Sequence, residues 1–172
     1  MPRPTRETLS SIQAIVFDFD GVFTDNRVYV SETGQEFVSC DRGDGMGITM
    51  LKSAGITMMI LSKEKNPVVS ARGAKLGVEV IQGCDDKLPV LQSWIAQHSI
   101  DVKRCVYIGN DINDKECLMY VGLAVIPHDA HDSVRKIGAW RLKASGGRGA
   151  IRELADGILG SRQKVERLTT TL

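Results

Sequence analysis

Residues 14–20 read Ala-Ile-Val-Phe-Asp-Phe-Asp and are followed by Gly21. The apolar start of this stretch has the length and composition of a buried β-strand. Its end changes character, because Asp18 and Asp20 flank a single phenylalanine and alternation places both carboxylates on one side of the strand. Unpaired carboxylates are costly to bury, and open α/β sheets bind their ligands at the carboxyl ends of strands. The stretch therefore predicts a functional site where the first strand ends.

Further apolar runs of strand length follow this stretch and alternate with segments of helical periodicity. This alternation predicts an α/β fold, a Rossmann-like doubly wound parallel sheet with helices on both faces. A turn that contains a glycine lies between two short runs, each with both polar and apolar residues. This pattern predicts a small β-hairpin flap after the first strand, with no separate cap domain. The predicted strands span 56–62, 78–83, 105–110 and 123–127, the predicted helices start near residues 45, 67 and 114, and the hairpin turn is at 31–34.

Length and composition favour one compact domain, since the chain has 172 residues of which 42% are hydrophobic. We expect an N-terminal extension over residues 1–12, a single domain over 13–160 and a C-terminal tail over 161–172. The formal net charge of +1 gives no basic surface of the kind that binds nucleic acid, so the expected partner is a small molecule. No apolar run reaches the roughly 20 residues of a membrane span, and no signal core precedes the domain. A cytoplasmic protein with reduced cysteines is the expectation.

Polar residues close the later predicted strands in a regular order. Ser62 ends the second strand, Lys87 follows the third, and the sequence Gly-Asn-Asp-Ile-Asn-Asp closes the fourth at 109–114. Each alone has an ordinary explanation, as a helix cap, a surface lysine or an acidic helix N-terminus. Their joint occurrence with the aspartate pair predicts one shared site.

The combination of DxDG, a hydroxyl residue, a lysine and an acidic cluster resembles the haloacid dehalogenase superfamily. The resemblance implies a phosphatase in which Asp18 is the nucleophile and forms a phospho-aspartate. Asp20 would act as general acid and then general base, while Ser62 and Lys87 would hold the transferring phosphoryl oxygens. The Asp18 carboxylate, the Asp20 main-chain carbonyl and the Asp111 carboxylate would bind Mg²⁺.

Physical chemistry agrees with these implied roles. A phosphate monoester is negatively charged and repels a carboxylate nucleophile, so the attack requires a metal ion and cationic donors. Mg²⁺ prefers hard oxygen ligands and keeps several waters, which suits a site with few protein ligands. One positioned carboxyl can protonate the leaving alkoxide and later deprotonate a water molecule.

The resemblance covers roughly residues 14–159 and narrows to the capless sugar-acid phosphatases, because of the short hairpin and the ending SGGRGAIRE at 145–153. That subfamily acts on 3-deoxy-octulosonate 8-phosphate or on 9-phosphates of nine-carbon 2-keto-3-deoxy acids, and it implies a homotetramer whose subunits cover one another's sites. Glu64, Arg72 and Lys75 resemble the sugar-acid contacts of the nine-carbon branch, whereas the octulosonate branch tends to have arginine in place of Glu64. Arg72 and Lys75 share a helix face, which an ordinary solvated basic surface would explain equally well.

Three alternatives remain at this stage. The 109–114 motif has Asn110 where many phosphatases have aspartate, which would weaken metal binding. The motif also resembles the C-terminal domain of some sialate cytidylyltransferases, in which the module can serve assembly alone. A response-regulator receiver also uses a phosphorylated aspartate, but its acid pair stands apart from that aspartate. His128 and His131 have zinc-like spacing without a third ligand nearby, so a polar loop is the preferred interpretation.

Overall fold

The computed structural model describes residues 3–170, with side chains described up to residue 163. One parallel sheet has the strand order β5-β4-β1-β6-β7-β8. The chain fills one side of the central strand β1 with β4 and β5, then crosses to the other side, which is the doubly wound order that the sequence predicts. The strands are β1 (Ala14–Phe17), β4 (Thr57–Leu61), β5 (Glu79–Ile81), β6 (Cys105–Ile108), β7 (Leu123–Ile126) and β8 (Trp140–Arg141).

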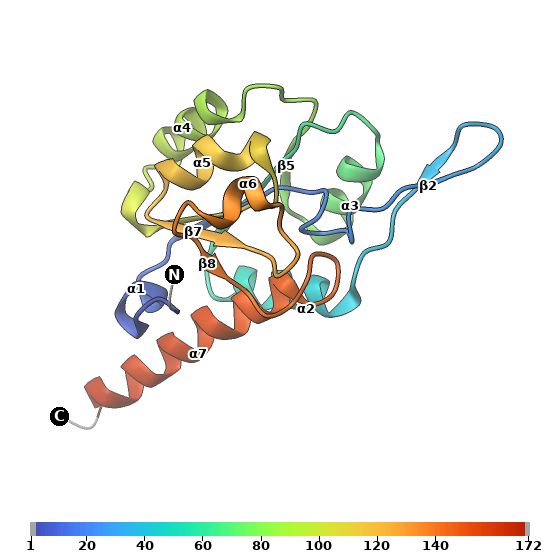
Figure 1. Ribbon diagram of the computed structural model, residues 1–172. Coiled ribbons are helices and arrows are strands. Elements are labelled where there is room, and N and C mark those ends of the chain that lie inside the picture. The colour runs from blue at the N-terminus through green and yellow to red at the C-terminus, as the bar shows by residue number, and fades with distance from the viewer. Residues whose placement is uncertain (1–2, 171–172) are drawn as a thin grey trace.

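Two apolar cores cover the two faces of the sheet, and Figure 1 shows the helices that lie around it. Alternation along β1 divides its side chains between them, because Ile15 and Phe17 join one core while Ala14 and Val16 join the other. The first core lies under α1 (Arg6–Ser10), α2 (Arg42–Ser53), α3 (Val68–Leu76) and α7 (Ala150–Thr170). The second lies under α4 (Lys87–Gln97), α5 (Lys115–Tyr120) and α6 (Asp132–Arg135), and short 3-10 turns at η1 (Val102–Arg104) and η2 (Ile112–Asp114) join these elements to β6.

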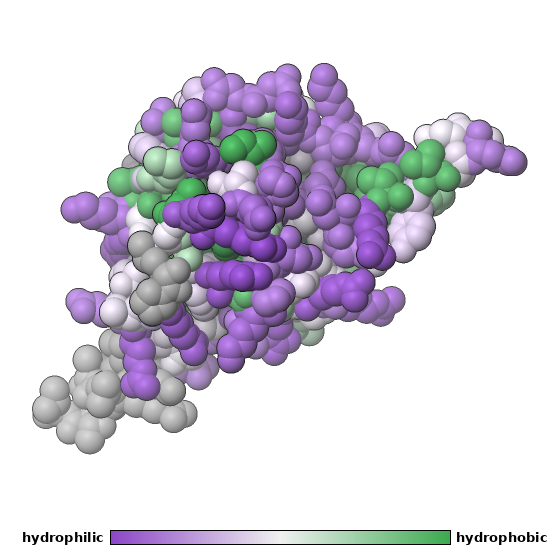
Figure 2. All heavy atoms as spheres, in the orientation of Figure 1, coloured by the Kyte–Doolittle hydropathy of each residue, from purple (hydrophilic) through white to green (hydrophobic). Residues whose placement is uncertain are grey.

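The predicted hairpin is formed by β2 (Tyr29–Val30) and β3 (Glu36–Phe37), which pair antiparallel and project from the body of the domain (Figure 1). Apolar side chains gather on its stem in the space-filling view of Figure 2. Val28, Tyr29, Val30 and Phe37 are all more than half exposed. The Asn66 amide donates a hydrogen bond to the Glu36 carboxylate at 2.9 Å and ties the hairpin to the start of α3.

The predicted N-terminal extension over residues 1–12 contains the helix α1, which packs against α7. Residues 1–2 of this extension lie outside the described part of the chain. Leu9 and Ile12 are buried in the first core.

The predicted C-terminal tail over 161–172 begins within α7, which continues to Thr170. The Arg162 guanidinium donates hydrogen bonds to the main-chain carbonyls of Ser10, Ile12 and Ala54. Residues 171–172 of that tail are outside the described part.

Within residues 3–170, no helix is both long and apolar enough to cross a bilayer.

Candidate active site

The aspartate pair lies where β1 ends, beside the end of β6. The Asp18 amide donates to the Ile108 carbonyl at 2.9 Å and continues the strand ladder, so the position of this residue is fixed by the sheet. Gly21 then turns the chain with φ +76°, and its amide donates to the Thr24 hydroxyl oxygen. A Cβ at Gly21 would lie 1.9 Å from the Asn110 amide nitrogen. The glycine of DxDG is therefore required by both its conformation and this close approach.

A cavity of about 130 Å³ opens at the strand ends where the sheet order reverses. This is the crevice in which doubly wound folds bind their ligands. Its walls bring together five sequence-predicted residues and four others. They are Asp18, Asp20, Asn26, Ser62, Lys63, Glu64, Asn110, Asp111 and Asn113.

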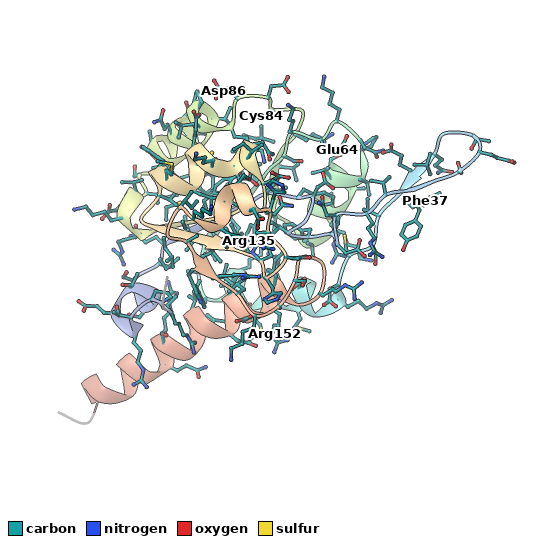
Figure 3. All side chains as sticks on the ribbon, viewed as in Figure 1. Phe37, Glu64, Cys84, Asp86, Arg135 and Arg152 are labelled. Atoms are coloured by element: carbon teal, nitrogen blue, oxygen red, sulfur yellow. The ribbon has the colours of Figure 1, made fainter. Side chains whose placement is uncertain are left out.

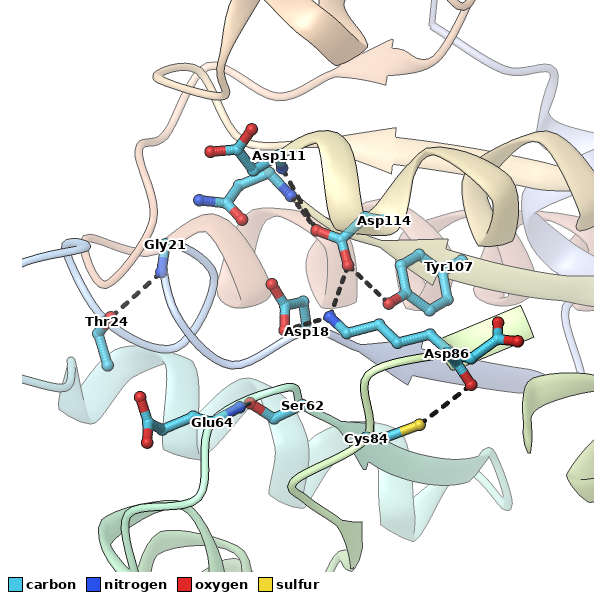
Figure 4. Close-up of polar contacts among 12 residues, drawn as sticks. Asp18, Gly21, Thr24, Ser62, Glu64, Cys84, Asp86, Tyr107, Asp111 and Asp114 are labelled. Carbon is cyan, nitrogen blue, oxygen red and sulfur yellow. Dashed lines mark hydrogen bonds and ion pairs between the residues drawn. The ribbon is translucent and has the colours of Figure 1, made fainter. Parts of the chain in front are cut away.

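Lys87 connects the acids of this site, as Figure 4 shows. It is the first residue of α4 and is almost completely buried. Its ammonium group donates to one oxygen of Asp18 and to one oxygen of Asp114, at 2.7 Å in each case. Burial lowers the pKa of Lys87, but the two carboxylates more than offset this effect and raise it above its ordinary value. The lysine therefore remains charged and leaves one ammonium proton for a ligand oxygen.

The two aspartates of the pair differ in their acidity. Burial, followed by the negative charge of Asp114, raises the pKa of Asp18 to about 8, although Lys87 opposes this shift. Burial and the charge of Glu64 raise the pKa of Asp20 to about 6. A carboxyl group with such a raised pKa is suited to general acid catalysis near neutral pH. The Asp18 environment lacks positive charge, since one ammonium faces two buried carboxylates.

Asp114 is completely buried and accepts four hydrogen bonds. One oxygen accepts from Lys87 and from the Tyr107 hydroxyl at 2.8 Å, and the other accepts from the main-chain amides of Asn110 and Asp111. The sequence predicts Asp114 only as the last residue of the polar cluster at 109–114, and it does not single out Tyr107. A tyrosine in an otherwise apolar strand was the single available signal.

Ser62 and Glu64 reach the cavity from the end of β4. Ser62 is buried and its hydroxyl oxygen accepts a hydrogen bond from the Glu64 amide at 3.1 Å. The Glu64 carboxylate accepts from the amides of Lys65 and Asn66, which fixes its orientation at the cavity wall. Figure 3 shows Glu64 between the body of the domain and the hairpin.

Arg72 and Lys75 do not line this cavity. The Arg72 guanidinium donates to the Asp41 carbonyl at 3.2 Å, at the start of α2, and its buried Nε has no hydrogen-bond partner within the described residues. Lys75 is exposed on α3. Neither of these two predicted substrate contacts is therefore among the residues that line the small cavity at the acids.

The donor set fits a magnesium ion. Asp18 and Asp111 line one cavity and have carboxylate oxygens, and the neighbouring asparagines have amide oxygens. The main-chain carbonyl of Asp20 stays a predicted third ligand. Among the residues whose side chains the structure describes, no three His, Cys, Asp or Glu side chains are grouped as a metal site. A divalent cation would also offset the negative charge around Asp18. Asp111 currently caps η2 by accepting from the Ile112 amide.

His131, one of the two histidines with zinc-like spacing, has a structural role. His131 caps α6 by accepting from the Ser133 amide, and its ring nitrogen lies 3.5 Å from an Asp111 oxygen. The part of the chain with described side chains contains no zinc-type cluster at His128 or His131.

The cysteines Cys40, Cys84, Cys105 and Cys117 are free thiols.

Known proteins resemble this chain over most of its length, although no protein-family model matches it. The 3-deoxy-D-manno-octulosonate 8-phosphate phosphatase KdsC of Yersinia pestis is 31% identical over 161 residues, which cover 93% of this chain and 86% of that protein. N-acylneuraminate cytidylyltransferase A of Danio rerio is 30% identical over 90% of this chain, which spans only 36% of the length of that relative.

Solved structures agree with these relatives. A HAD family hydrolase from Streptomyces avermitilis has 48% identity and a TM-score of 0.86, covering 91% of this chain and 88% of its own. The octulosonate 8-phosphate phosphatase of Moraxella catarrhalis, solved with magnesium, phosphate and KDO, has 27% identity and a TM-score of 0.88, with 96% of both chains covered. Fold, site and relatives together show that the chain belongs to the haloacid dehalogenase superfamily, in its subfamily of capless sugar-acid phosphatases.

Proposed function

We propose that this chain is a Mg²⁺-dependent phosphomonoesterase that acts on a phosphorylated 2-keto-3-deoxy sugar acid. The observation that carries the proposal is the buried contact of Lys87 with Asp18, because Asp18 lines a cavity together with Asp20 and Ser62. A purely structural ion pair would not account for the presence of Asp20 and Ser62 at the same cavity. A phosphoryl group between them would meet a nucleophile, a proton donor and cationic and hydroxyl donors at once.

In the proposed reaction an Asp18 carboxylate oxygen attacks phosphorus, the bond to the sugar oxygen breaks and a phospho-aspartate forms. Asp20 gives its proton to the leaving alkoxide, then takes a proton from the water that hydrolyses the phospho-aspartate and releases inorganic phosphate. Lys87 and Ser62 hold the phosphoryl oxygens through both steps. When bound, Mg²⁺ supplies charge neutralisation at the phosphoryl group.

The nine-carbon branch is our first candidate for the sugar acid, because Glu64 is fixed at the cavity wall. Arg72 and Lys75 contribute to sugar-acid binding in this proposal only from a neighbouring subunit, since they lie outside the cavity of their own chain. We therefore propose a homotetramer in which subunits complete one another's sites.

Two other functions are each favoured by one relative. The similarity to the Yersinia pestis phosphatase favours 3-deoxy-octulosonate 8-phosphate as substrate. The similarity to the Danio rerio cytidylyltransferase favours an assembly module without activity. The complete set of Asp18, Asp20, Ser62, Lys87 and Asp111 supports catalysis over that second alternative.

The decisive experiment measures phosphate release from both sugar-acid phosphates and from an aryl phosphate, with and without Mg²⁺. We expect Mg²⁺-dependent release, with a higher kcat/KM for the nine-carbon 9-phosphate. A higher value for the octulosonate ester would move the chain to the other branch. Failure on every ester would leave the assembly module as the function.

A further inference from the structure

The Tyr107 hydroxyl group lies in the apolar interior and has a specific partner. Its side chain is completely buried in β6, within the core beneath α4 and α5. The hydroxyl donates at 2.8 Å to an oxygen of Asp114. The same oxygen accepts the Lys87 ammonium at 2.7 Å. The tyrosine and the lysine therefore share one acceptor atom (Figure 4).

The sharing affects the lysine because the remaining partners are fixed. The second oxygen of Asp114 accepts from the amides of Asn110 and Asp111, so the carboxylate cannot turn away. Lys87 divides its ammonium protons between Asp114 and Asp18. Without the hydroxyl, the shared oxygen would be left to the ammonium alone, which would shift toward Asp114 and away from Asp18.

We propose that Tyr107 is a positioning residue whose hydroxyl, acting through Asp114, keeps the Lys87 ammonium centred and aims its third proton at a bound phosphoryl group. This inference rests on the proposed phosphatase function. Tyr107 touches neither the substrate nor the reacting atoms. An alternative is that the hydroxyl only satisfies a buried carboxylate, and the two readings differ in their effect on anion binding.

The test compares Tyr107→Phe with the wild type by measuring the dissociation constant of orthovanadate, an anion that resembles a transferring phosphoryl group. Calorimetry in the presence of Mg²⁺ gives this constant without any turnover. We expect it to rise about tenfold, on the scale of one hydrogen bond to a charged group. The kcat/KM should fall by a similar factor on sugar and aryl phosphates alike, because the phosphoryl group is common to both.

Tyr120→Phe is the matched control, since Tyr120 lies on α5 and is partly exposed. We expect its orthovanadate binding to equal that of the wild type. A Tyr107→Phe chain with lower kcat but unchanged orthovanadate binding would overturn the proposal, because a purely structural defect reduces only the active fraction. Loss of folding in Tyr107→Phe would overturn it as well, since the hydroxyl would then be a structural requirement.

A double-mutant cycle tests the route through Asp114. In an Asp114→Asn background, we expect Tyr107→Phe to change orthovanadate binding less than about twofold, because the charged intermediary is gone. A tenfold rise in the dissociation constant of orthovanadate in that background would contradict the proposal that Tyr107 acts through Asp114. A wild type that binds orthovanadate but releases no phosphate from any ester would defeat the phosphatase proposal and leave the binding comparison intact.

Discussion

Asp18 and Asp20 belong to one motif but differ in acidity, because their surroundings differ. Asp18 is 4% exposed and touches Lys87, whereas Asp20 lies at the cavity wall near Glu64. Asp18 is the proposed nucleophile, and a divalent cation would offset the negative charge that, with burial, raises its pKa to about 8. Asp20 is the proposed proton donor, and its pKa is raised to about 6. Alternation in the sequence predicted that both face one site. Their separate acidities depend on burial and on partners from other elements, which the sequence does not reveal.

Replacing Asp18 by asparagine should abolish turnover without unfolding the domain. The substitution is nearly isosteric but removes the nucleophilic carboxylate. We expect phosphate release to fall at least about 100-fold, a typical loss for a catalytic group, while circular dichroism stays unchanged. Asp156→Asn is the matched control, because Asp156 lies on the exposed surface of α7. Substantial activity in the Asp18 variant would assign the nucleophile to another residue.

Asp111→Asn should raise the Mg²⁺ requirement. Asparagine can still accept the Ile112 amide and cap η2, so the local fold should persist while a charged metal ligand is lost. We expect the Mg²⁺ concentration for half-maximal activity to rise about tenfold, as for one lost charge-assisted contact. The Mg²⁺-induced rise in Tm should weaken in parallel. An unchanged Mg²⁺ titration by both measurements would transfer the ligand role to another carboxylate.

At the scale of elements, the hairpin and every strand of the sheet except β8 could be predicted, whereas β8 and the full length of α7 could not. The predicted run at 105–110 contains β6, because two buried faces make a parallel strand uniformly apolar. The strand β8 has only two residues, so its pattern is too short to detect. The length of α7 depends on its anchoring by Arg162 to distant carbonyl groups. Such long-range polar contacts leave no local periodicity.

Asp44 of α2 stabilises the start of another helix. Its buried carboxylate accepts from the main-chain amides of Gly149 and Arg152, at the N-terminus of α7. Asp44→Ala leaves these donors without their acceptor, and we expect a loss of about 1–3 kcal/mol in the free energy of unfolding. Asp41→Ala is the control, because Asp41 caps only its own helix by accepting from the Asp44 amide, and should cost about 1 kcal/mol. Equal losses in urea titrations would contradict this role.

At the scale of the whole molecule, the exposed hairpin indicates an assembly. Tyr29 and Phe37 are directly opposite each other in the β2–β3 pair, and both are more than half exposed. Figure 3 shows Phe37 directed away from the domain. Contiguous exposed apolar side chains of this kind mark interaction surfaces. In the proposed tetramer, a neighbouring subunit would cover the cavity and exclude water.

The double variant Tyr29→Ser with Phe37→Ser should therefore dissociate the proposed tetramer. We expect sedimentation to give a tetramer mass for the wild type and a smaller mass for the variant at equal concentration. Met119→Ser is the control, because Met119 is also more than half exposed but lies on α5, and the mass of this variant should match the wild type. A wild type that sediments as a monomer, or a variant that keeps the full mass, would contradict a hairpin interface.

Mixed assemblies test whether Arg72 serves the site of a neighbour. Arg72 does not line the cavity at Asp18, and in the proposed tetramer it would contact the sugar acid bound by a neighbouring chain. Asp18→Asn chains should be inactive, and Arg72→Ala chains should lose roughly tenfold in kcat/KM on the sugar acid while retaining activity on an aryl phosphate. In a mixed tetramer, an Arg72→Ala chain supplies Asp18 while its Asp18→Asn neighbour supplies Arg72. Co-assembly should thus restore sugar-acid activity above the sum of the separate variants. Activity that never exceeds this sum would place Arg72 outside the neighbouring site and leave it as a support for the start of α2.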